Sequence, residues 1–301
     1  MNAPLPIDID LPFDRPQDYL RWRERKLARY PTRTEDLVVE VRDPLNPTAA
    51  EVGEIRRICE VANMAVYSTP LAGVPDKAIP LRLGECLGLA HLHANPLADE
   101  DGVSSLQAVP EKSAAGYIPY SNQRLLWHTD GYYIRPPERI CAFILHCVQP
   151  AASGGENCLL DPEIAYILLR DADPEYVKAL TAPDAMTIPA NVVDGSEIRA
   201  ACVGPVFSTH GGRIHMRYTA RTRSVRWRPD EVTRAATAFL GRIFDAGSPH
   251  VFKLRLEAGQ GLVCNNVLHN RSAFGDEPGQ SRLVYRARYS DRVAPSDTPL
   301  S

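Results

Sequence analysis

A short run of apolar residues at 140–148 limits the folds open to this chain more than any other feature of its sequence. Pro136-Pro137 precede the run and Pro150 follows it. The run is too short for a typical core helix, so it predicts a buried strand. Proline is also abundant, with 26 residues spread along the chain, which favours many loops over a helical bundle.

Further strands are predicted in the second half of the chain, at Asn157–Leu160, 251–256, 261–265 and 281–289. Helices are predicted from apolar spacing and start signals at 16–29, 48–64, 162–170, 174–180 and 229–244. Gly211-Gly212 are expected to turn a hairpin. Because strands lie on both sides of the helical stretch, we expect a single domain over 1–301. It would have an N-terminal region of helix and strand at 1–110 packed on a β core at 115–290, with a helical insertion at about 162–245.

Trp127-His128-Thr129-Asp130 carries the residues best suited to bind a metal. If this segment ends a strand, side chains alternate, so His128 and Asp130 face the same side. One imidazole and one carboxylate can occupy two adjacent positions on a metal ion. A second histidine would complete the ligand set of the non-haem iron(II) oxygenases, which leaves positions open for substrate and O2. Taken alone, a His-x-Asp pair is more often a coincidence than a metal site.

His269 is the candidate for the third ligand. It follows the predicted strand at 261–265 and begins a polar turn. Distant strands meet at the mouth of a β-barrel, so ligands far apart in sequence can converge there. His91 and His93 form a rival pair, but no carboxylate can be argued as its partner, and we interpret that pair as structural.

Arg282, Arg286 and Arg288 alternate along the predicted strand at 281–289, so they are expected to share one face. If that face lies inside the β core, the guanidinium groups need anions, because an unpaired buried charge is costly. Arginine binds a carboxylate through two parallel hydrogen bonds, so a dicarboxylate co-substrate fits one arginine and an anionic substrate group fits another. The alternative is a solvated, basic edge strand.

Together these residues resemble a known family, the taurine dioxygenase-like (TauD/TfdA) Fe(II)/2-oxoglutarate-dependent dioxygenases. The metal motif Trp127-His128-Thr129-Asp130, and His269 followed by Arg282 and Arg286, carry the likeness. Within the family, the chain is most similar to the γ-butyrobetaine hydroxylase-like branch. The motifs that suggest this branch are Tyr120-Ser121-Asn122, Pro136-Pro137, Leu145-His146-Cys147, and Gly154-Gly155-Glu156-Asn157 followed by Asp161. The likeness extends from about residue 115 to 290.

The resemblance implies a mostly β fold with flanking helices around a double-stranded β-helix (jelly-roll, cupin-like) core. It implies a catalytic Fe(II) bound by His128, Asp130 and His269. It also implies 2-oxoglutarate bound by Arg282 and Asn157, with Arg286 binding an anionic group of the substrate. The implied reaction uses O2 to hydroxylate an unactivated C–H bond and releases succinate and CO2. Because Asp130 keeps the carboxylate that a halide site would replace, we expect hydroxylation rather than halogenation, with desaturation as the lesser alternative.

Tyr132 and Tyr133 directly follow the metal motif and are candidates for the substrate pocket. Tyrosine faces can bind a quaternary ammonium group. Packing inside the barrel is the simpler alternative for both residues.

Composition narrows the expected partners to a small-molecule substrate. The net charge of −3 gives no basic field for nucleic acid, and no apolar run is long enough to span a membrane. The N-terminus lacks the pattern of a secretory signal. Seven scattered cysteines, with no CxxC pair, favour reduced thiols and a cytoplasmic location. Family members commonly self-associate, which leaves a homo-oligomer open.

Two other functions remain as alternatives. A non-catalytic β-barrel protein that binds a metal or metabolite would be expected to lack at least one metal or co-substrate residue, whereas all of them are present. A zinc-dependent hydrolase would need no pair of arginines after the last metal ligand.

Overall fold

The computed structural model describes residues 15–93, 99, 101–109, 118–135, 138–245 and 247–295. Residues 1–14 of the predicted N-terminal region, and the motif Pro136-Pro137, lie outside these ranges. The chain divides into two compact units, each assembled from separate segments. The first unit comprises Met1–Tyr30, Trp127–Arg139 and Leu160–Val251, and the second comprises Pro31–Leu126, Ile140–Leu159 and Phe252–Ser301. The single domain expected from the sequence stays a prediction.

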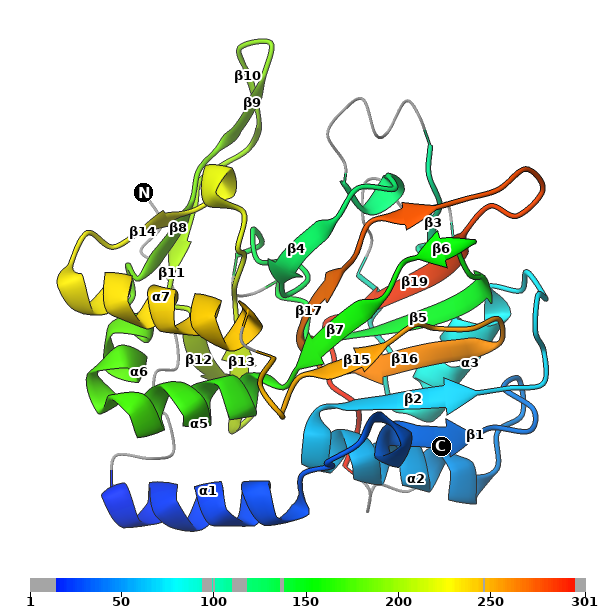
Figure 1. Ribbon diagram of the computed structural model, residues 1–301, viewed down its shortest axis with the longest axis horizontal. Coiled ribbons are helices and arrows are strands. Elements are labelled where there is room, and N and C mark those ends of the chain that lie inside the picture. Colours follow the sequence, from blue (N-terminus) through cyan, green and yellow to red (C-terminus); the bar gives the residue numbers. More distant parts are fainter. Residues whose placement is uncertain are drawn as a thin grey trace. The chain divides into compact units, whose positions relative to one another are not determined.

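A six-stranded sheet is the main sheet of the second unit, in the order β1-β2-β16-β5-β19-β3 (Figure 1). Its strands are β1 (Val38–Glu40), β2 (Met64–Ser68), β16 (Gln260–Cys264), β5 (Ala142–Gln149), β19 (Leu283–Tyr289) and β3 (Ser104–Leu106). β5 lies inside the sheet, antiparallel to both β16 and β19. All its residues except the last are buried, so the strand predicted at 140–148 is confirmed.

The N-terminal region contributes strands to this sheet instead of only packing on it. β1 and β2 form one edge, and β3 forms the other. β1 pairs with β2 in parallel, and β2 pairs with β16 in the antiparallel direction. β1 and β3 have three residues each, which is too short to show a strand period in the sequence.

Two helices of the second unit pack on the same sheet, α2 (Ala49–Ala62) and α3 (Ala78–Cys86). α2 contacts β1 and β2, and α3 contacts β5 and β19. The Glu51 amide donates to the Thr48 hydroxyl, while the Thr48 amide donates to the Glu51 carboxylate. This capping box confirms that α2 starts after Thr48.

A four-stranded sheet, in the order β15-β7-β17-β4, carries two of the candidate metal ligands, His128 and His269. Its strands are β15 (Phe252–Leu254), β7 (Asn157–Leu160), β17 (Leu268–Arg271) and β4 (Leu125–His128). β6 (Ser153–Gly154) pairs separately with β18 (Phe274–Gly275). A 3-10 turn at Ile118–Tyr120 precedes β4, and another at Thr34–Leu37 precedes β1. The boundary between the two units falls within β4.

Helices and short strands together make up the first unit. The helices are α1 (Pro16–Arg29), α5 (Pro162–Ala172), α6 (Pro174–Leu180) and α7 (Glu231–Asp245), close to the predicted ranges. The strands are β8 (Met186–Ile188), β9 (Asn191–Val193), β10 (Ser196–Arg199), β11 (Cys202–Gly204), β12 (Phe207–His210), β13 (Arg213–Met216) and β14 (Arg226–Trp227), with a 3-10 turn at Thr222–Ser224. The insertion at about 162–245 is therefore a mixture of helices and strands. Gly211 and Gly212 form the turn that connects β12 to β13, with φ values of 56° and 71°, which confirms the hairpin.

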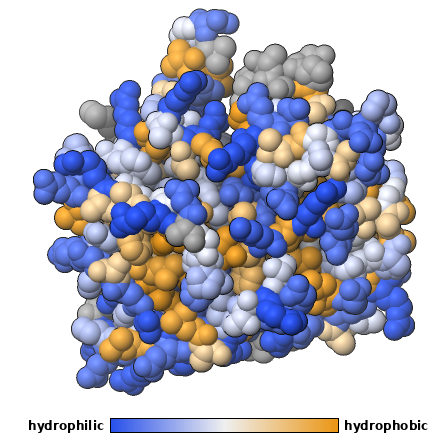
Figure 2. All heavy atoms as spheres, in the orientation of Figure 1, coloured by the Kyte–Doolittle hydropathy of each residue, from blue (hydrophilic) through white to orange (hydrophobic). Residues whose placement is uncertain are grey.

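The predicted fold class, mostly β with flanking helices, is confirmed. In Figure 2, hydrophilic residues cover much of the visible face, with hydrophobic residues between them, as is usual for a globular protein. No helix in the described ranges is long and apolar enough to cross a membrane. All seven cysteines are free thiols. A cytoplasmic location stays a prediction.

A buried cation joins α1 to the start of α5 within the first unit. Lys26 Nζ lies 2.6 Å from Asp161 Oδ2 and 2.5 Å from Glu163 Oε2, and all three residues are buried. Burial lowers the pKa of Lys26, but the two carboxylates outweigh that effect and raise this pKa overall. Asp161 also caps α5, because its carboxylate accepts a hydrogen bond from the Glu163 amide. One lysine therefore neutralises two buried carboxylates at a helix start.

Lys26→Met should reduce the free energy of unfolding by about 3–5 kcal/mol, because two buried carboxylates lose their counter-ion. Arg23→Met is a matched control on the same helix, since it removes the half-exposed ion pair with Asp171, worth about 0–1 kcal/mol. Urea unfolding at pH 7 measures both losses. Equal losses of unfolding free energy in the two variants would show that the buried ion pairs of Lys26 stabilise the protein no more than the surface pair of Arg23.

His146 on β5 is buried and is held neutral by its surroundings. The Tyr67 hydroxyl donates to the Leu145 carbonyl at 3.2 Å and lies 3.0 Å from His146 Nδ1. Because that hydroxyl has a single proton, Nδ1 is the donor of the second hydrogen bond. The rings of Tyr67 and His146 stack, with centroids 6.0 Å apart. Burial lowers the pKa of His146 from 6.5 to about 4.

Stability should therefore fall as the pH drops from 6.5 to about 4. In this window the unfolded chain binds a proton at His146 that the folded chain does not, so the free energy of unfolding decreases. The shift in the pKa of His146 should lower the free energy of unfolding by about 3 kcal/mol across this pH window. His146→Gln should flatten the dependence of the urea midpoint on pH. An equally steep dependence in the variant would assign the loss to other groups.

Candidate metal centre and co-substrate site

Backbone hydrogen bonds fix the segment that carries His128 and Asp130 at the end of β4. The Thr129 amide donates to the Tyr218 carbonyl at 3.1 Å, and the Tyr218 amide donates to the Thr129 hydroxyl at 3.1 Å. An isolated bridge joins His128 to Thr219. With the segment held in this way, His128 Nε2 and Asp130 Oδ1 lie 3.6 Å apart. The Thr129 side chain is engaged with Tyr218, so the two predicted ligands can face a metal.

His269 lies on β17, with a ring orientation set by its neighbours. Its Nδ1 lies 2.9 Å from the Val267 carbonyl. A carbonyl can only accept, so Nδ1 carries the proton and Nε2 is the nitrogen suited to coordinate a metal. The Phe143 ring packs against the imidazole, with centroids 4.9 Å apart. The chain therefore presents His269 in the tautomer that a metal ligand needs.

The structure brings the three predicted ligands together. One ligand atom from each of His128, Asp130 and His269 lies within 4.8 Å of the other two. The residues are 7%, 6% and 8% exposed. Two imidazole nitrogens and one carboxylate oxygen suit Fe(II), and three protein ligands leave further positions for exogenous groups. The donor set therefore fits the iron ion that the family likeness implies.

Arg282 is buried beside a second arginine that the sequence analysis missed. The guanidinium groups of Arg271 and Arg282 lie over the Phe274 ring, 4.7 and 5.2 Å from its centroid. Burial and then the charge of Arg282 lower the pKa of Arg271 to about 9, and burial also lowers the pKa of Arg282. Within the described part of the chain, neither arginine forms an ion pair with a carboxylate. Two adjacent buried cations without a carboxylate partner are suited to bind an anion.

The hydrogen bonds of this arginine pair go to backbone carbonyls. Arg271 donates to the carbonyls of Ser121 and Gln123, and Arg282 donates to the Leu106 carbonyl at 3.4 Å. Arg271 is two residues after the third predicted ligand on the same strand, so alternation places both on one face. That spacing is the sequence signal that could have identified it.

Asn157 lies on β7 near Arg282. Its side-chain amide donates to the Gly155 carbonyl at 3.3 Å. A Cβ atom added at Gly155 would lie 3.9 Å from Arg282 Nε, so the two segments are in contact. Asn157 is also buried. The two residues expected to bind 2-oxoglutarate therefore belong to one neighbourhood of the second unit.

Arg286 and Arg288 lie on β19, between β5 and β3 in the sheet. Arg282 precedes the strand, and the register with β5 shifts between Leu283 and Val284. The three arginines are 7% (Arg282), 7% (Arg286) and 4% (Arg288) exposed. The alternative of a solvated basic edge strand is therefore wrong, because β19 is an interior strand and its arginines are buried.

Tyr132 and Tyr133 form a row of aromatic contacts with His128. The Tyr132 ring meets His128 edge-on at 6.4 Å between centroids, and Tyr133 meets Tyr132 edge-on at 5.3 Å. Arg199, at the end of β10, lies over the Tyr133 ring at 5.5 Å. Both tyrosines are partly exposed. Sequence reasoning missed Arg199 because its hairpin is too short to show a strand pattern.

Contrary to expectation, the rival pair of histidines has a carboxylate neighbour, Asp291, but among the described residues the pair belongs to no group of three that could hold a metal ion. His91 is exposed, with Nδ1 2.9 Å from Asp291 Oδ1 and its amide donating to Asp291 Oδ2 at 2.6 Å. The His93 amide donates to the Arg288 carbonyl at 2.7 Å. These contacts join the segment before β3 to the end of β19.

Comparison with known proteins identifies relatives in sequence. The model of the taurine catabolism dioxygenase TauD, TfdA family matches residues 70–288. A uridine-5′-phosphate dioxygenase from Streptomyces sp is 30% identical over 218 residues, which covers 69% of this chain and 77% of the relative.

Solved structures of non-haem iron oxygenases share the fold. The crystal structure of asparagine oxygenase has a TM-score of 0.60 at 18% identity, covering 80% of this chain and 77% of that one. The oxygenase OrfP in complex with Fe and alpha-ketoglutaric acid has a TM-score of 0.59 at 18% identity, covering 84% of this chain and 86% of that one. At such identities the likeness is one of fold.

Asp130→Ala and His269→Ala should each weaken Fe(II) binding by at least about 100-fold while the protein stays folded, because each removes one of three ligands. His91→Ala, which removes an exposed histidine, should leave binding unchanged. Iron content after anaerobic dialysis measures the effect, and circular dichroism checks the fold. Full iron retention by a folded Asp130 or His269 variant would exclude that residue as a ligand.

Proposed function

Because this chain belongs to the TauD/TfdA family of dioxygenases, we propose that it hydroxylates an unactivated C–H bond of a small anionic or zwitterionic molecule. Family membership makes it a 2-oxoglutarate-dependent dioxygenase, an enzyme whose cofactors are Fe(II), 2-oxoglutarate and O2. The observation that carries the proposal is the close approach of His128, Asp130 and His269. Bound Fe(II) would let O2 convert 2-oxoglutarate to succinate and CO2, with the second oxygen atom inserted into the substrate.

In this proposal the ligands are held in place before the metal arrives. The Val267 carbonyl fixes the proton of His269 on Nδ1, and the Thr129–Tyr218 pair fixes the backbone between the other two ligands. All three ligands are buried, which supports the exclusion of bulk water from the reaction. The protein thus orients the ligands and excludes bulk water, and the iron would contribute the oxidising chemistry.

Arg282 and Asn157 bind 2-oxoglutarate in this proposal. Arg282 takes the distal carboxylate, since its buried guanidinium has only backbone carbonyls as described hydrogen-bond acceptors. The carboxylate supplies the negative charge that burial of Arg282 and Arg271 demands. Asn157 bonds the carbonyl of Gly155, which lies beside Arg282, so we assign Asn157 to the other end of the co-substrate.

Arg286 is proposed to bind an anionic group of the substrate, with Tyr132 and Tyr133 lining the pocket. Arg286 is buried, and the tyrosines contact one another beside His128. The relatives act on or bind small anionic or zwitterionic molecules: uridine-5′-phosphate, 3-hydroxyasparagine and hydroxyarginine. Uridine-5′-phosphate is the first candidate to test, because that relative is the one with 30% identity.

We also propose that the sheets form a double-stranded β-helix, with the metal in its core. Support comes from the presence of a six-stranded and a four-stranded sheet, the latter with β17 beside β4. The solved oxygenases with TM-scores of 0.59 and 0.60 further favour this arrangement.

The purified protein, supplied with Fe(II), 2-oxoglutarate and O2, should release succinate faster when its substrate is added. The panel contains uridine-5′-phosphate, L-asparagine, L-arginine, betaines and sulfonates, and mass spectrometry should find one product heavier by one oxygen atom. Arg282→Lys should raise the KM for 2-oxoglutarate by about 10-fold or more, because lysine cannot form the paired hydrogen bonds. Arg124→Lys, at an exposed position, is the control.

The alternatives give different outcomes in the same experiment. A visible absorption band on anaerobic addition of Fe(II) and 2-oxoglutarate, without turnover of either 2-oxoglutarate or any substrate, would favour a non-catalytic binding protein. Absence of both the band and succinate would refute the oxygenase.

A further inference from the structure

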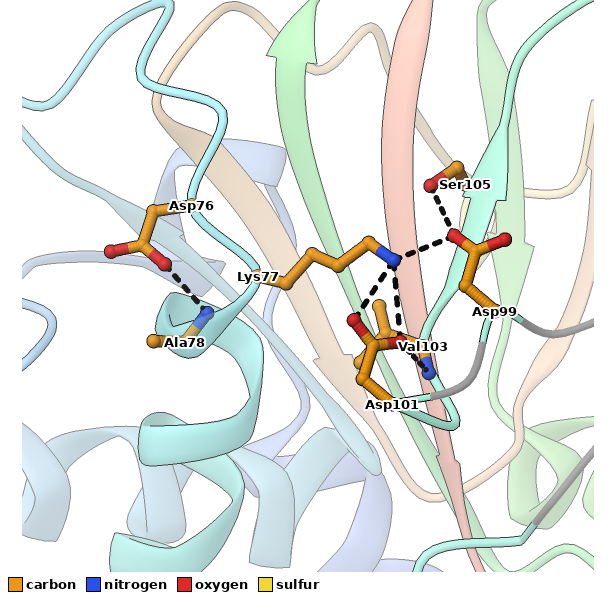
Figure 3. A network of polar contacts seen from close by, with 7 residues as sticks. All are labelled: Asp76, Lys77, Ala78, Asp99, Asp101, Val103 and Ser105. Carbon is orange, nitrogen blue, oxygen red and sulfur yellow. Dashed lines mark hydrogen bonds and ion pairs between the residues drawn. The ribbon is translucent and has the colours of Figure 1, made fainter.

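Lys77 lies between two carboxylates at the start of α3, and we call Lys77, Asp99 and Asp101 the Lys77 clamp (Figure 3). Lys77 Nζ is 2.6 Å from Asp99 Oδ2 and 2.9 Å from Asp101 Oδ2. The lysine side chain is 24% exposed and each carboxylate is 39% exposed. Both carboxylates raise the pKa of Lys77 more than burial lowers it. The lysine is thus the cation that keeps two negative charges together.

Each carboxylate of the clamp also binds the residues that lead into β3. Asp101 accepts a hydrogen bond from the Val103 amide at 2.9 Å, and Asp99 accepts one from the Ser105 hydroxyl at 2.7 Å. Figure 3 shows Lys77 extending from the start of α3 to both carboxylates, with Val103 and Ser105 beside them. The clamp therefore fastens one end of β3 to α3.

β3 in turn touches the arginines of the proposed co-substrate and substrate sites. It pairs with β19 so that Ser104 lies opposite Arg286 and Leu106 opposite Val284. The Leu106 carbonyl accepts a hydrogen bond from Arg282 Nη1 at 3.4 Å. β3 is an edge strand of three residues, so its own ladder is too short to hold it firmly.

From these contacts we propose that Lys77 is a positioning residue for 2-oxoglutarate binding. Its charge holds Asp99 and Asp101 together, the carboxylates hold β3 on β19, and Leu106 of β3 orients Arg282. Without the ammonium group the carboxylates repel one another and β3 loosens at its first residues. This inference rests on the proposed function, in which Arg282 binds the co-substrate.

The test compares 2-oxoglutarate affinity in clamp variants by anaerobic titration of the Fe(II)-loaded protein. Lys77→Met should raise the Kd for 2-oxoglutarate by about 3- to 10-fold, with unchanged Fe(II) affinity. Lys77→Arg keeps the charge and should restore binding. Adding Asp101→Asn to Lys77→Met should restore it in part, because one repelling charge is removed while the acceptor for Val103 remains.

Arg82→Met is the matched control, because Arg82 is an exposed cation on the same helix whose ion pair is with Glu85. It should leave the Kd for 2-oxoglutarate unchanged. Hydrogen exchange gives a readout independent of the metal: amides of Ser104–Leu106 should exchange faster in Lys77→Met than in Arg82→Met.

Two negative results separate this inference from the function on which it rests. If the unaltered protein binds 2-oxoglutarate and Lys77→Met binds it equally well, the positioning role is wrong and the oxygenase stands. If the unaltered protein with Fe(II) binds no 2-oxoglutarate, the proposed function fails, and the role of Lys77 fails with it.

Discussion

Burying a positive charge is costly unless the group is paired or fully hydrogen-bonded, and two buried clusters of this protein meet that cost differently. In the first unit Lys26 is matched within the chain by Asp161 and Glu163. In the second unit Arg271 and Arg282 are buried over one phenylalanine ring, and their described hydrogen bonds go to backbone carbonyls. Lysine could relieve such a position by losing its proton, but arginine cannot do so near neutral pH. The arginine pair therefore suits the anionic co-substrate that we propose for it.

The three predicted metal ligands are oriented by neighbouring groups that are not themselves candidate ligands. His269 needs its proton on Nδ1, and the Val267 carbonyl two residues away supplies the acceptor. His128 lies in a segment pinned by backbone bonds to Tyr218 and Thr219. Ligands held in this way lose little conformational freedom when a metal binds, which favours affinity and a single geometry.

Sequence reasoning succeeded where the signal is local. The helices at Pro16–Arg29 and Pro174–Leu180 and the strand at Asn157–Leu160 have the predicted bounds, since proline, capping residues and apolar spacing mark them directly. The placement of His128 and Asp130 followed from alternation over three residues. The proximity of His269 could not be read from a local pattern. It was expected because distant strands meet at the mouth of a barrel, and the resemblance to a family then implied the same ligand.

The short strands were not predicted because a strand of this length forms through pairing with its neighbours, and its own sequence carries little signal. β3 and the strands from β8 to β11 have three or four residues each, too few for a period to emerge. Arg199 was missed for that reason, since it ends one of them. Arg271 was missed because a buried arginine and a solvated one look alike in sequence. Its packing over Phe274 distinguishes them in the structure, and its place two residues after His269 was the one hint in the sequence.

The spacing of arginines at β19 explains how one segment can serve two anions. Arg282 precedes the strand and reaches Phe274 and the Leu106 carbonyl, whereas Arg286 pairs with Leu145 and Ser104 within the sheet. Four residues of extended chain separate the two backbones by about 13 Å. Two like charges at that distance repel by only about 1 kcal/mol at an effective dielectric constant near 20. The spacing therefore allows each arginine to bind its own anion, as the proposed function requires of Arg282 and Arg286.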